Sequence, residues 1–374
     1  MKIFLIAGAR PNFMKIAPIV RALQKARGQR TEDGSQNSND LSWKIVHTGQ
    51  HYDYKMSQAF FDDLEIPVPD FFLEAGSGSH AEQTAKVMVA FEKVCEDERP
   101  DIVVVVGDVN STLACSVVAK KLMIDVAHVE AGLRSFDLSM PEEINRMVTD
   151  SISDYFFVTE ESGVENLLKE GKSKEKIHFV GHVMIDNLLH QVDKLKNENV
   201  SQFGISELKN KFEKYAFLTL HRPSNVDDRS TLAGIIEALN EISQDIPIIF
   251  PVHPRTRKMM DEFKIELSEQ VHLLEPLGFR EALFLWKDAV MVMTDSGGLQ
   301  EETTALGVPC LTIRENTERP ITVEMGTNTL AGNKKEDILR CYKDIIINGK
   351  QGSIPPKWDG KAAERIVNIL MKNY

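Results

Sequence analysis

The sequence predicts an α/β protein made of two Rossmann-like domains, each a doubly wound parallel sheet covered by helices. Its 374 residues are enough for about two domains of ordinary size. Short apolar runs rich in β-branched residues alternate with helix-length amphipathic segments, as in βαβ units. Several runs are apolar throughout, as expected for parallel strands buried on both faces. The ten or eleven runs form two sets, which fits two sheets better than one eight-unit barrel.

The two sets of expected strands define the domain organisation. The first set is 2–7, 43–48, 102–106, 126–129, 155–158 and 177–180. The second set is 216–220, 246–252, 271–274, 289–294 and 308–313. A polar stretch over 190–214 separates them, so we expect an N-terminal domain over 1–185 and a C-terminal domain over 186–359.

Two further segments have a clear pattern. Residues 27–42 are almost wholly polar and predict a solvated loop. Residues 360–374 have the pattern of an amphipathic helix that either caps the second domain or crosses back to the first. We expect it to complete the first domain.

Composition excludes several classes of partner. The chain has 44 basic and 56 acidic residues and a net charge of −12, which argues against nucleic-acid binding. No apolar run approaches the ~20 residues of a membrane span, and the run at Ile3–Ala9 predicts a strand rather than a signal sequence. The four cysteines lie far apart without a CxxC pair, which argues against disulfides and zinc and indicates a cytoplasmic protein.

Ligands of doubly wound sheets bind at the carboxyl ends of the strands. After the first strand, Arg10 and Lys15 lie in the first turns of a helix, where they could bind an anion, although a solvated surface pair is the alternative. The GxGxxG pattern is absent here, and the second expected strand ends without an acidic residue. A bound NAD is therefore not expected.

Carboxylates follow the next strands. Asp108 comes after 102–106 and Glu130 after 126–129, so we expect the two side by side, each raising the pKa of the other for general acid–base catalysis. Glu142 lies at the start of the following helix. The alternatives are a helix N-cap for Asp108 and an interaction with the helix dipole for Glu142.

The second half offers a cationic and glycine-rich set of residues. His221 and His253 each follow a strand and stand beside an arginine, Arg255 in the second case, which suggests an anion-binding surface. Ser296, Gly297 and Gly298 form a turn between a strand and a helix, where backbone N–H groups could bind a diphosphate. Glu302 could accept hydrogen bonds from ribose hydroxyls, and Arg319 lies further along. A purely structural glycine turn is the alternative.

Nine motifs in order resemble those of the non-hydrolysing UDP-N-acetylglucosamine 2-epimerases: GARPNFMKIAP, GQHYD, VVGDVNST, HVEAGLRS, MPEEINR, LHRPSNVD, PVHPRT, TDSGGLQEE and ENTERP. The resemblance implies a GT-B-like fold with two Rossmann domains facing a cleft, a homodimer, a UDP-sugar substrate, and neither NAD nor an obligatory metal. It places Asp108, Glu130, Glu142 and His221 around the sugar. It places on the UDP portion Arg10, Lys15, Ser296, Gly297, Gly298, Glu302 and Arg319, with His253 and Arg255 nearby.

The implied reaction is epimerisation at C2 of UDP-GlcNAc, through elimination of UDP to 2-acetamidoglucal and its re-addition. The alternatives are a hydrolysing 2-epimerase, a 2-epimerase of a modified UDP-sugar such as UDP-2,3-diacetamido-glucuronic acid, a GT-B glycosyltransferase and a UDP-sugar sensor. The chain departs from the family twice. His182 follows Gly181 where the family often has asparagine, and Tyr52 follows Gln50 and His51 where members activated by substrate often have arginine.

Overall fold

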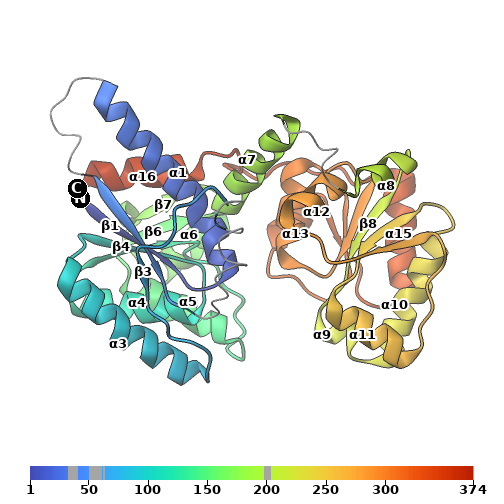
Figure 1. The fold of residues 1–374 in the computed structure, drawn as a ribbon, viewed down its shortest axis with the longest axis horizontal. Coiled ribbons are helices and arrows are strands. Elements are labelled where there is room, and N and C mark those ends of the chain that lie inside the picture. Colours follow the sequence, from blue (N-terminus) through green and yellow to red (C-terminus); the bar gives the residue numbers. More distant parts are fainter. Residues whose placement is uncertain (33–40, 50–60, 62–63, 198–203, 374) are drawn as a thin grey trace. The chain divides into compact units, whose positions relative to one another are not determined.

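The computed structural model describes residues 1–32, 41–49, 61, 64–197 and 204–373. It divides into two compact units, the first formed by Met1–Asn187 with Pro356–Tyr374 and the second by Leu188–Pro355. Each unit contains one parallel sheet with helices on both faces (Figure 1). The predicted α/β class with two parallel Rossmann-type sheets is confirmed.

The sheet of the first unit has seven strands in the order β3-β2-β1-β4-β5-β6-β7. Alternate residues of β1 enter opposite cores: Leu5 faces the cluster that contains α1 and α16, and Phe4 the cluster that contains α3 and α4. This two-sided burial explains the unbroken apolar runs. The strands are β1 (Lys2–Ala7), β2 (Ser42–His47), β3 (Phe71–Phe72), β4 (Ile102–Val106), β5 (Asp125–Val129), β6 (Tyr155–Val158) and β7 (Ile177–Phe179). The helices are α1 (Arg10–Glu32), α3 (His80–Glu98), α4 (Asn110–Lys121), α5 (Pro141–Ile152), α6 (Glu161–Lys169), α7 (Val183–Asn197) and α16 (Ala362–Asn373).

The sheet of the second unit has six strands in the order β10-β9-β8-β11-β12-β13. Its core gathers apolar residues of these strands with those of α10 and α15. The strands are β8 (Ala216–Thr219), β9 (Ile248–Pro251), β10 (Val271–Leu274), β11 (Met291–Thr294), β12 (Cys310–Thr312) and β13 (Asn328–Leu330). The helices are α8 (Ser206–Lys211), α9 (Pro223–Val226), α10 (Arg229–Ile242), α11 (Pro254–Phe263), α12 (Phe279–Trp286), α13 (Gly297–Leu306), α14 (Pro320–Glu324) and α15 (Lys335–Asn348).

Some elements differ from the sequence prediction. The polar loop expected from residue 27 begins later, because α1 continues to Glu32 despite Gly28 within it. The polar stretch 190–214 contains the end of α7 and all of α8. The C-terminal helix α16 packs on α1, and Asp186 accepts hydrogen bonds from the N–H groups of Ala362 (3.1 Å) and Ala363 (2.7 Å) at its start.

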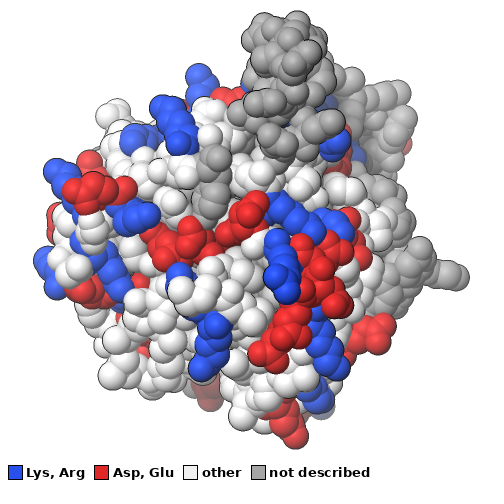
Figure 2. All heavy atoms as spheres, turned by 90° about the vertical axis from the view of Figure 1, so that its left-hand side faces the viewer, with Lys and Arg blue, Asp and Glu red and all other residues white. Residues whose placement is uncertain are grey.

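The distribution of surface charge and the hydropathy of the helices agree with what the composition predicts. On the face drawn in Figure 2, basic and acidic side chains are interspersed rather than segregated into a continuous basic area. The described helices all fall short of the length and apolar character that a bilayer crossing needs.

The strand order reverses at one place in each sheet, between β1 and β4 and between β8 and β11. At such a point the connections leave in opposite directions and open a crevice at the carboxyl ends of the strands. The residues singled out from the sequence follow these four strands and their neighbours β5 and β9, except Arg319, which follows β12.

Candidate active site

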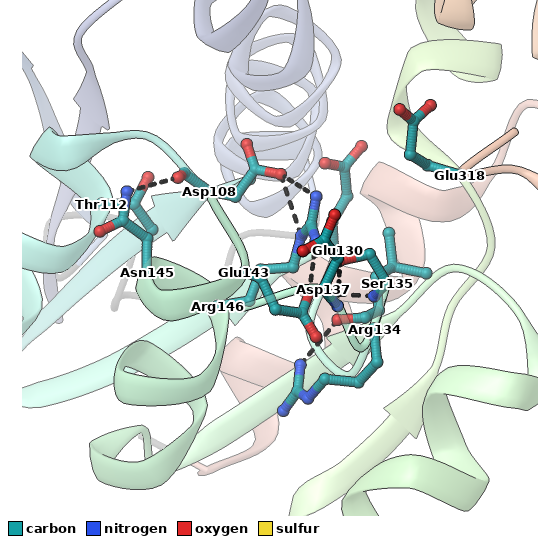
Figure 3. Close-up of polar contacts among 12 residues, drawn as sticks. Asp108, Thr112, Glu130, Arg134, Ser135, Asp137, Glu143, Asn145, Arg146 and Glu318 are labelled. Atoms are coloured by element: carbon teal, nitrogen blue, oxygen red, sulfur yellow. Dashed lines mark hydrogen bonds and ion pairs between the residues drawn. The ribbon is translucent and has the colours of Figure 1, made fainter. Parts of the chain in front are cut away.

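Asp108 lies in the turn between β4 and α4 and bonds to an arginine from α5. Gly107 before it has a φ of +67°, a conformation that favours glycine. Arg146 donates to Oδ2 of Asp108 from Nε at 3.0 Å and from an Nη at 2.7 Å. Asn145 donates to the backbone carbonyl of Asp108 at 2.8 Å (Figure 3). The carboxylate thus has a fixed position and a paired charge, while 27% of the side chain remains exposed.

The same arginine connects Asp108 to Glu143. Arg146 donates to Glu143 at 2.7 Å, and Glu143 also accepts the N–H groups of Ser135 and Phe136, each at 3.0 Å. Burial alone would raise the pKa of Glu143, but these hydrogen bonds hold it below its ordinary value. Glu142, the sequence candidate, lies next to it on the exposed side of the first turn of α5. The Asp108 network therefore contains Glu143.

Glu130 follows β5 in a left-handed backbone conformation with a φ of +71°. Such a conformation is strained for a non-glycine residue and often marks a functional position. Its buried carboxylate forms an ion pair with Lys15 from α1. A Cβ at Gly107 would lie 2.8 Å from Nζ of Lys15 and 3.5 Å from Oε2 of Glu130, so glycine leaves room for the pair. Nε2 of His182 lies 4.0 Å from Oε1 of Glu130.

This geometry bears on two expectations. Asp108 and Glu130 were expected side by side, each raising the pKa of the other, and in the structure each carboxylate is paired with its own cation, Arg146 or Lys15. Lys15 bonds to Glu130, and its place beside an external anion stays a prediction. The side chain of Arg10, at the start of α1, lies outside the described part of the chain, as do Gln50, His51 and Tyr52.

A buried ionic network connects the turns that carry the two carboxylates. Asp150 of α5 accepts hydrogen bonds from His128 Nδ1 (2.7 Å) and Gly132 N–H (3.0 Å), and its Oδ2 pairs with Arg134 at 2.7 Å. His128 also reaches the carbonyl of Gly107 through Nε2 at 2.8 Å. Through these two contacts the His128 ring links Asp150 to the turn before Asp108. Burial would raise the pKa of Asp150, but His128 and Arg134 hold it below its ordinary value.

In the second unit, His221 and Asp295 meet at the reversal point of the sheet. β8 and β11 are parallel neighbours with Thr219 opposite Thr294, so the residues that follow them lie side by side. Nδ1 of His221 lies 2.8 Å from Oδ1 of the fully buried Asp295, while 42% of the His221 side chain is exposed. The imidazole ring of His253 lies 5.7 Å from that of His221, between ring centres.

Arg255 and His253, both expected near an anionic ligand, have partners within the second unit. Its guanidinium forms an exposed ion pair with Asp227, with Nε 2.7 Å from Oδ1. His253 caps α11 by accepting the N–H of Arg255 on Nδ1 at 3.2 Å. Its neutral form therefore carries hydrogen on Nε2.

The glycine turn leads into α13, which begins at Gly297 with Ser296 as N-cap. The Ser296 side chain makes no capping hydrogen bond, and a Cβ at Gly297 or Gly298 would meet no atom within 4 Å. The start of this helix is therefore open to a ligand that accepts hydrogen bonds from its backbone N–H groups. Further along α13, burial and the neighbouring Glu301 raise the pKa of Glu302 to about 8.

Arginines near this turn are paired with carboxylates. Arg319 bonds to Glu301 through Nε at 2.7 Å. Arg314 bonds to Glu318 at 3.0 and 2.8 Å. Burial would raise the pKa of Glu318, but Arg314 and Arg222 lower it to about 2.

Comparison with known proteins identifies the family. The family profile described as UDP-N-acetylglucosamine 2-epimerase matches residues 34–371. The chain belongs to the UDP-N-acetylglucosamine 2-epimerase family. It is thus an epimerase, as the nine motifs implied.

Relatives match over the full length. The UDP-N-acetylglucosamine 2-epimerase of Methanocaldococcus jannaschii is 46% identical over 377 residues, covering 99% of each chain. The UDP-2,3-diacetamido-2,3-dideoxy-D-glucuronate 2-epimerase of Pseudomonas aeruginosa is 38% identical over 375 residues, covering 100% of each. The crystal structure of the Methanocaldococcus jannaschii epimerase in complex with UDP-GlcNAc and UDP matches with a TM-score of 0.83 at 43% identity, covering 100% of both chains.

Several site residues of this epimerase were not singled out from the sequence: Arg146, Asp150, His182 and Asp295. Of these, Asp295 had a readable signal, because it follows a strand as Asp108 does. Arg146 and Asp150 lie inside a helix, where nothing local distinguishes them from surface residues. Within the described ranges, no group of three His, Cys, Asp or Glu side chains could hold a metal ion.

Proposed function

We propose that this epimerase interconverts UDP-N-acetylglucosamine and UDP-N-acetylmannosamine without releasing free sugar. Its family and its full-length similarity to the Methanocaldococcus jannaschii enzyme support this substrate. The observation that carries the proposal is the pair of carboxylates, Asp108 and Glu130, each paired with its own cation after the neighbouring strands β4 and β5 of the first sheet. An epimerase of this kind needs two proton-transfer groups, whereas a glycosyltransferase needs one base.

The chemistry requires elimination, because the hydrogen on C2 of the sugar is too weakly acidic for simple exchange. A carboxylate removes the C2 proton while the C1–O bond to UDP breaks, and the electron pair forms the C1–C2 double bond of 2-acetamidoglucal. UDP then adds back to C1 while an acid delivers a proton to the opposite face of C2. Atoms and charge balance without an oxidant or a metal.

We assign proton transfer to Asp108 and Glu130, with Glu142 supporting them. After one turnover the first group has gained a proton and the second has lost one, so both must exchange with solvent before the next cycle. In D2O the product must therefore carry deuterium at C2. Arg146 and Lys15 hold the two carboxylates in place.

The second unit would bind the leaving group. We assign the diphosphate to the open N-terminus of α13 at Ser296, Gly297 and Gly298, with His221 acting at the leaving oxygen. Glu302 would bond to the ribose. We propose supporting roles in UDP binding for Arg10, Lys15 and Arg319, and a place beside the ligand for His253 and Arg255.

The test is NMR of the purified protein with UDP-GlcNAc in D2O, without added NAD or metal. We expect UDP-ManNAc deuterated at C2 and no accumulation of free sugar. Free ManNAc with UDP would make the protein a hydrolysing epimerase instead. If no reaction occurs, the proposed substrate is wrong.

A second candidate is a 2-epimerase of a modified sugar. The 38% identity to the Pseudomonas aeruginosa relative, named for UDP-2,3-diacetamido-2,3-dideoxy-D-glucuronate, favours it. The discriminating measurement is kcat/KM for the two UDP-sugars under identical conditions. A value at least tenfold higher for UDP-GlcNAc is expected, and the reverse order would favour the second candidate.

We further propose a cytoplasmic homodimer whose product supplies polysaccharide synthesis. All four cysteines are free, and three of them are buried, as suits a reducing compartment.

The proposed dimer rests on a surface of the first unit. α3, α4 and α5 line an apolar groove of about 460 Å³, and apolar side chains on α3 and α5 are exposed: Val89, Ile144, Met147 and Val148. Sedimentation equilibrium should give a dimer, and Ile144→Asp should shift it toward monomer. A monomeric wild type would contradict the proposal.

A further inference from the structure

The contact between His221 and Asp295 has a consequence for the proposed reaction. Nδ1 of His221 and Oδ1 of Asp295 form an ion-pair contact at 2.8 Å, and because two bare lone pairs would repel at that distance, the nitrogen must carry the hydrogen. We propose that Asp295 is a positioning residue that keeps hydrogen on Nδ1 of His221 and thereby presents Nε2 to the leaving diphosphate. This inference rests on the proposed function for the identity of the ligand, but the tautomer itself does not.

Hydrogen bonds hold the carboxylate of Asp295 in a fixed orientation. Its Oδ2 accepts the N–H of His221 at 2.9 Å, the N–H of Arg222 at 2.7 Å and the Asn225 amide at 3.3 Å. Asn225 in turn donates to the carbonyl of Ile313 at 2.8 Å. These bonds fix the plane of the carboxylate, so that Oδ1 is left for Nδ1 of His221.

The charge state of Asp295 fits this role. Burial alone would raise the pKa of Asp295, but the contact with His221 and the backbone N–H groups outweigh burial, and the pKa lies below its ordinary value. Asp295 is therefore a carboxylate near neutral pH. An anion beside Nδ1 can compensate positive charge on the His221 ring when Nε2 shares a proton with the departing oxygen.

The surroundings leave the other side of the ring accessible. Asp295 is fully buried, whereas His221 is 42% exposed. The neighbouring His253 has its own Nδ1 occupied by the Arg255 N–H, and Arg222 pairs with Glu318 at 3.9 Å. The two histidines thus have their tautomers set by different means, a carboxylate for His221 and a backbone N–H for His253.

The first experiment reads the tautomer directly in the wild-type protein. ¹⁵N NMR of histidine-labelled protein, with the His221 signals assigned by their loss in His221→Asn, should show Nδ1 protonated. A His221 with bare Nδ1 and protonated Nε2 would overturn the proposal. Because no substrate is present, this result is independent of the proposed function.

The second experiment is a double-mutant cycle on UDP-GlcNAc epimerisation. Asp295→Asn keeps an oxygen for the backbone N–H groups but turns an N–H toward His221, which forces hydrogen onto Nε2 and removes the negative charge beside the ring. We expect kcat to fall about 10²-fold or more with KM little changed, because general acid catalysis contributes about 10²–10⁴-fold. Since Asp295 acts through His221, the double variant should be no slower than His221→Asn alone.

Two results would overturn the proposal. One is a kcat of the double variant that falls by the product of the two single-variant losses, and the other is an Asp295→Asn kcat within about threefold of wild type. Asp228→Asn is the matched control, because it alters a capping carboxylate elsewhere in the second unit, at α10, and should leave kcat unchanged. An inactive wild type would refute the proposed substrate and leave the NMR result as the test of the tautomer.

Discussion

Glu302→Gln should remove the loss of stability that the second unit suffers as pH rises and Glu302 ionises. Glu302 is buried in α13, and burial with the adjacent charge of Glu301 raises its pKa to about 8 from an ordinary 4.5. Glutamine has nearly the same shape and cannot ionise. The substitution therefore isolates the cost of ionising one buried carboxyl.

The sign and size follow from proton linkage. Between pH 4.5 and about 8 the folded Glu302 keeps its proton while the unfolded one has lost it, so the free energy of unfolding falls as pH rises. Each pH unit contributes about 1.4 kcal/mol, which over this window amounts to about 5 kcal/mol. The loss is absent below pH 4.5 and complete above about pH 8.

The assay is denaturant unfolding of nucleotide-free protein at pH 5 and pH 8.5. Trp286 is buried in the second unit, so its fluorescence in a Trp43→Phe, Trp358→Phe background reports that unit. We expect Glu302→Gln to match its parent within about 1 kcal/mol at pH 5 and to exceed it by up to about 5 kcal/mol at pH 8.5.

Exposed Glu262 supplies the control, because Glu262→Gln should leave the pH dependence unchanged. If Glu302→Gln lowered stability equally at both pH values, the folded carboxyl would be ionised and well bonded. The reasoning from burial would then be refuted.

Three further predictions concern the first unit. Lys15→Met should lower kcat about 10²-fold in a steady-state assay, because Glu130 loses the cation that holds it in place; a kcat within about threefold of wild type would contradict this. Glu143→Gln should lower the free energy of unfolding by about 3 kcal/mol, because it breaks a buried ion pair. Glu142→Gln should change the free energy of unfolding by under ~0.5 kcal/mol but lower kcat at least about tenfold. Equal losses of stability for the two variants in urea unfolding would refute this distinction. Asp150→Ala should cost about 4 kcal/mol in the same assay and Asp150→Asn clearly less, since the amide can still accept hydrogen bonds; equal losses would contradict the assigned contacts.

Long apolar strands were readable from the sequence, and short edge strands were not. β4 is five consecutive buried residues and was predicted with its observed bounds. β3 has two residues and β13 three, and both lie at a sheet edge, so their apolar signal is too short to stand out. The early end predicted for the first helix has a similar cause, because a polar helical turn and a polar loop have the same composition.

Candidate site residues were readable where a topological rule applied. Asp108 and Glu130 follow buried strands, and the carboxyl ends of parallel strands bind ligands. Their partners were hidden by distance along the chain, since Arg146 is 38 residues from Asp108 and Lys15 is 115 from Glu130. Because the sequence does not reveal these partners, the two carboxylates were expected to raise each other's pKa. In the folded chain, each is paired with its own cation.

The chain carries a net charge of −12, yet the proposed ligand is an anion that must approach the start of α13. Local neutralisation resolves this conflict, because Arg319 pairs with Glu301 and Glu302 stays protonated up to about pH 8. A protonated carboxyl can both donate and accept a hydrogen bond, whereas an ionised one would repel a diphosphate. We infer that the burial which makes Glu302 costly to ionise also supplies an uncharged hydrogen-bonding group for the nucleotide. Glu302→Gln should accordingly weaken UDP binding far less at pH 7 than Glu302→Ala, which removes the polar group altogether.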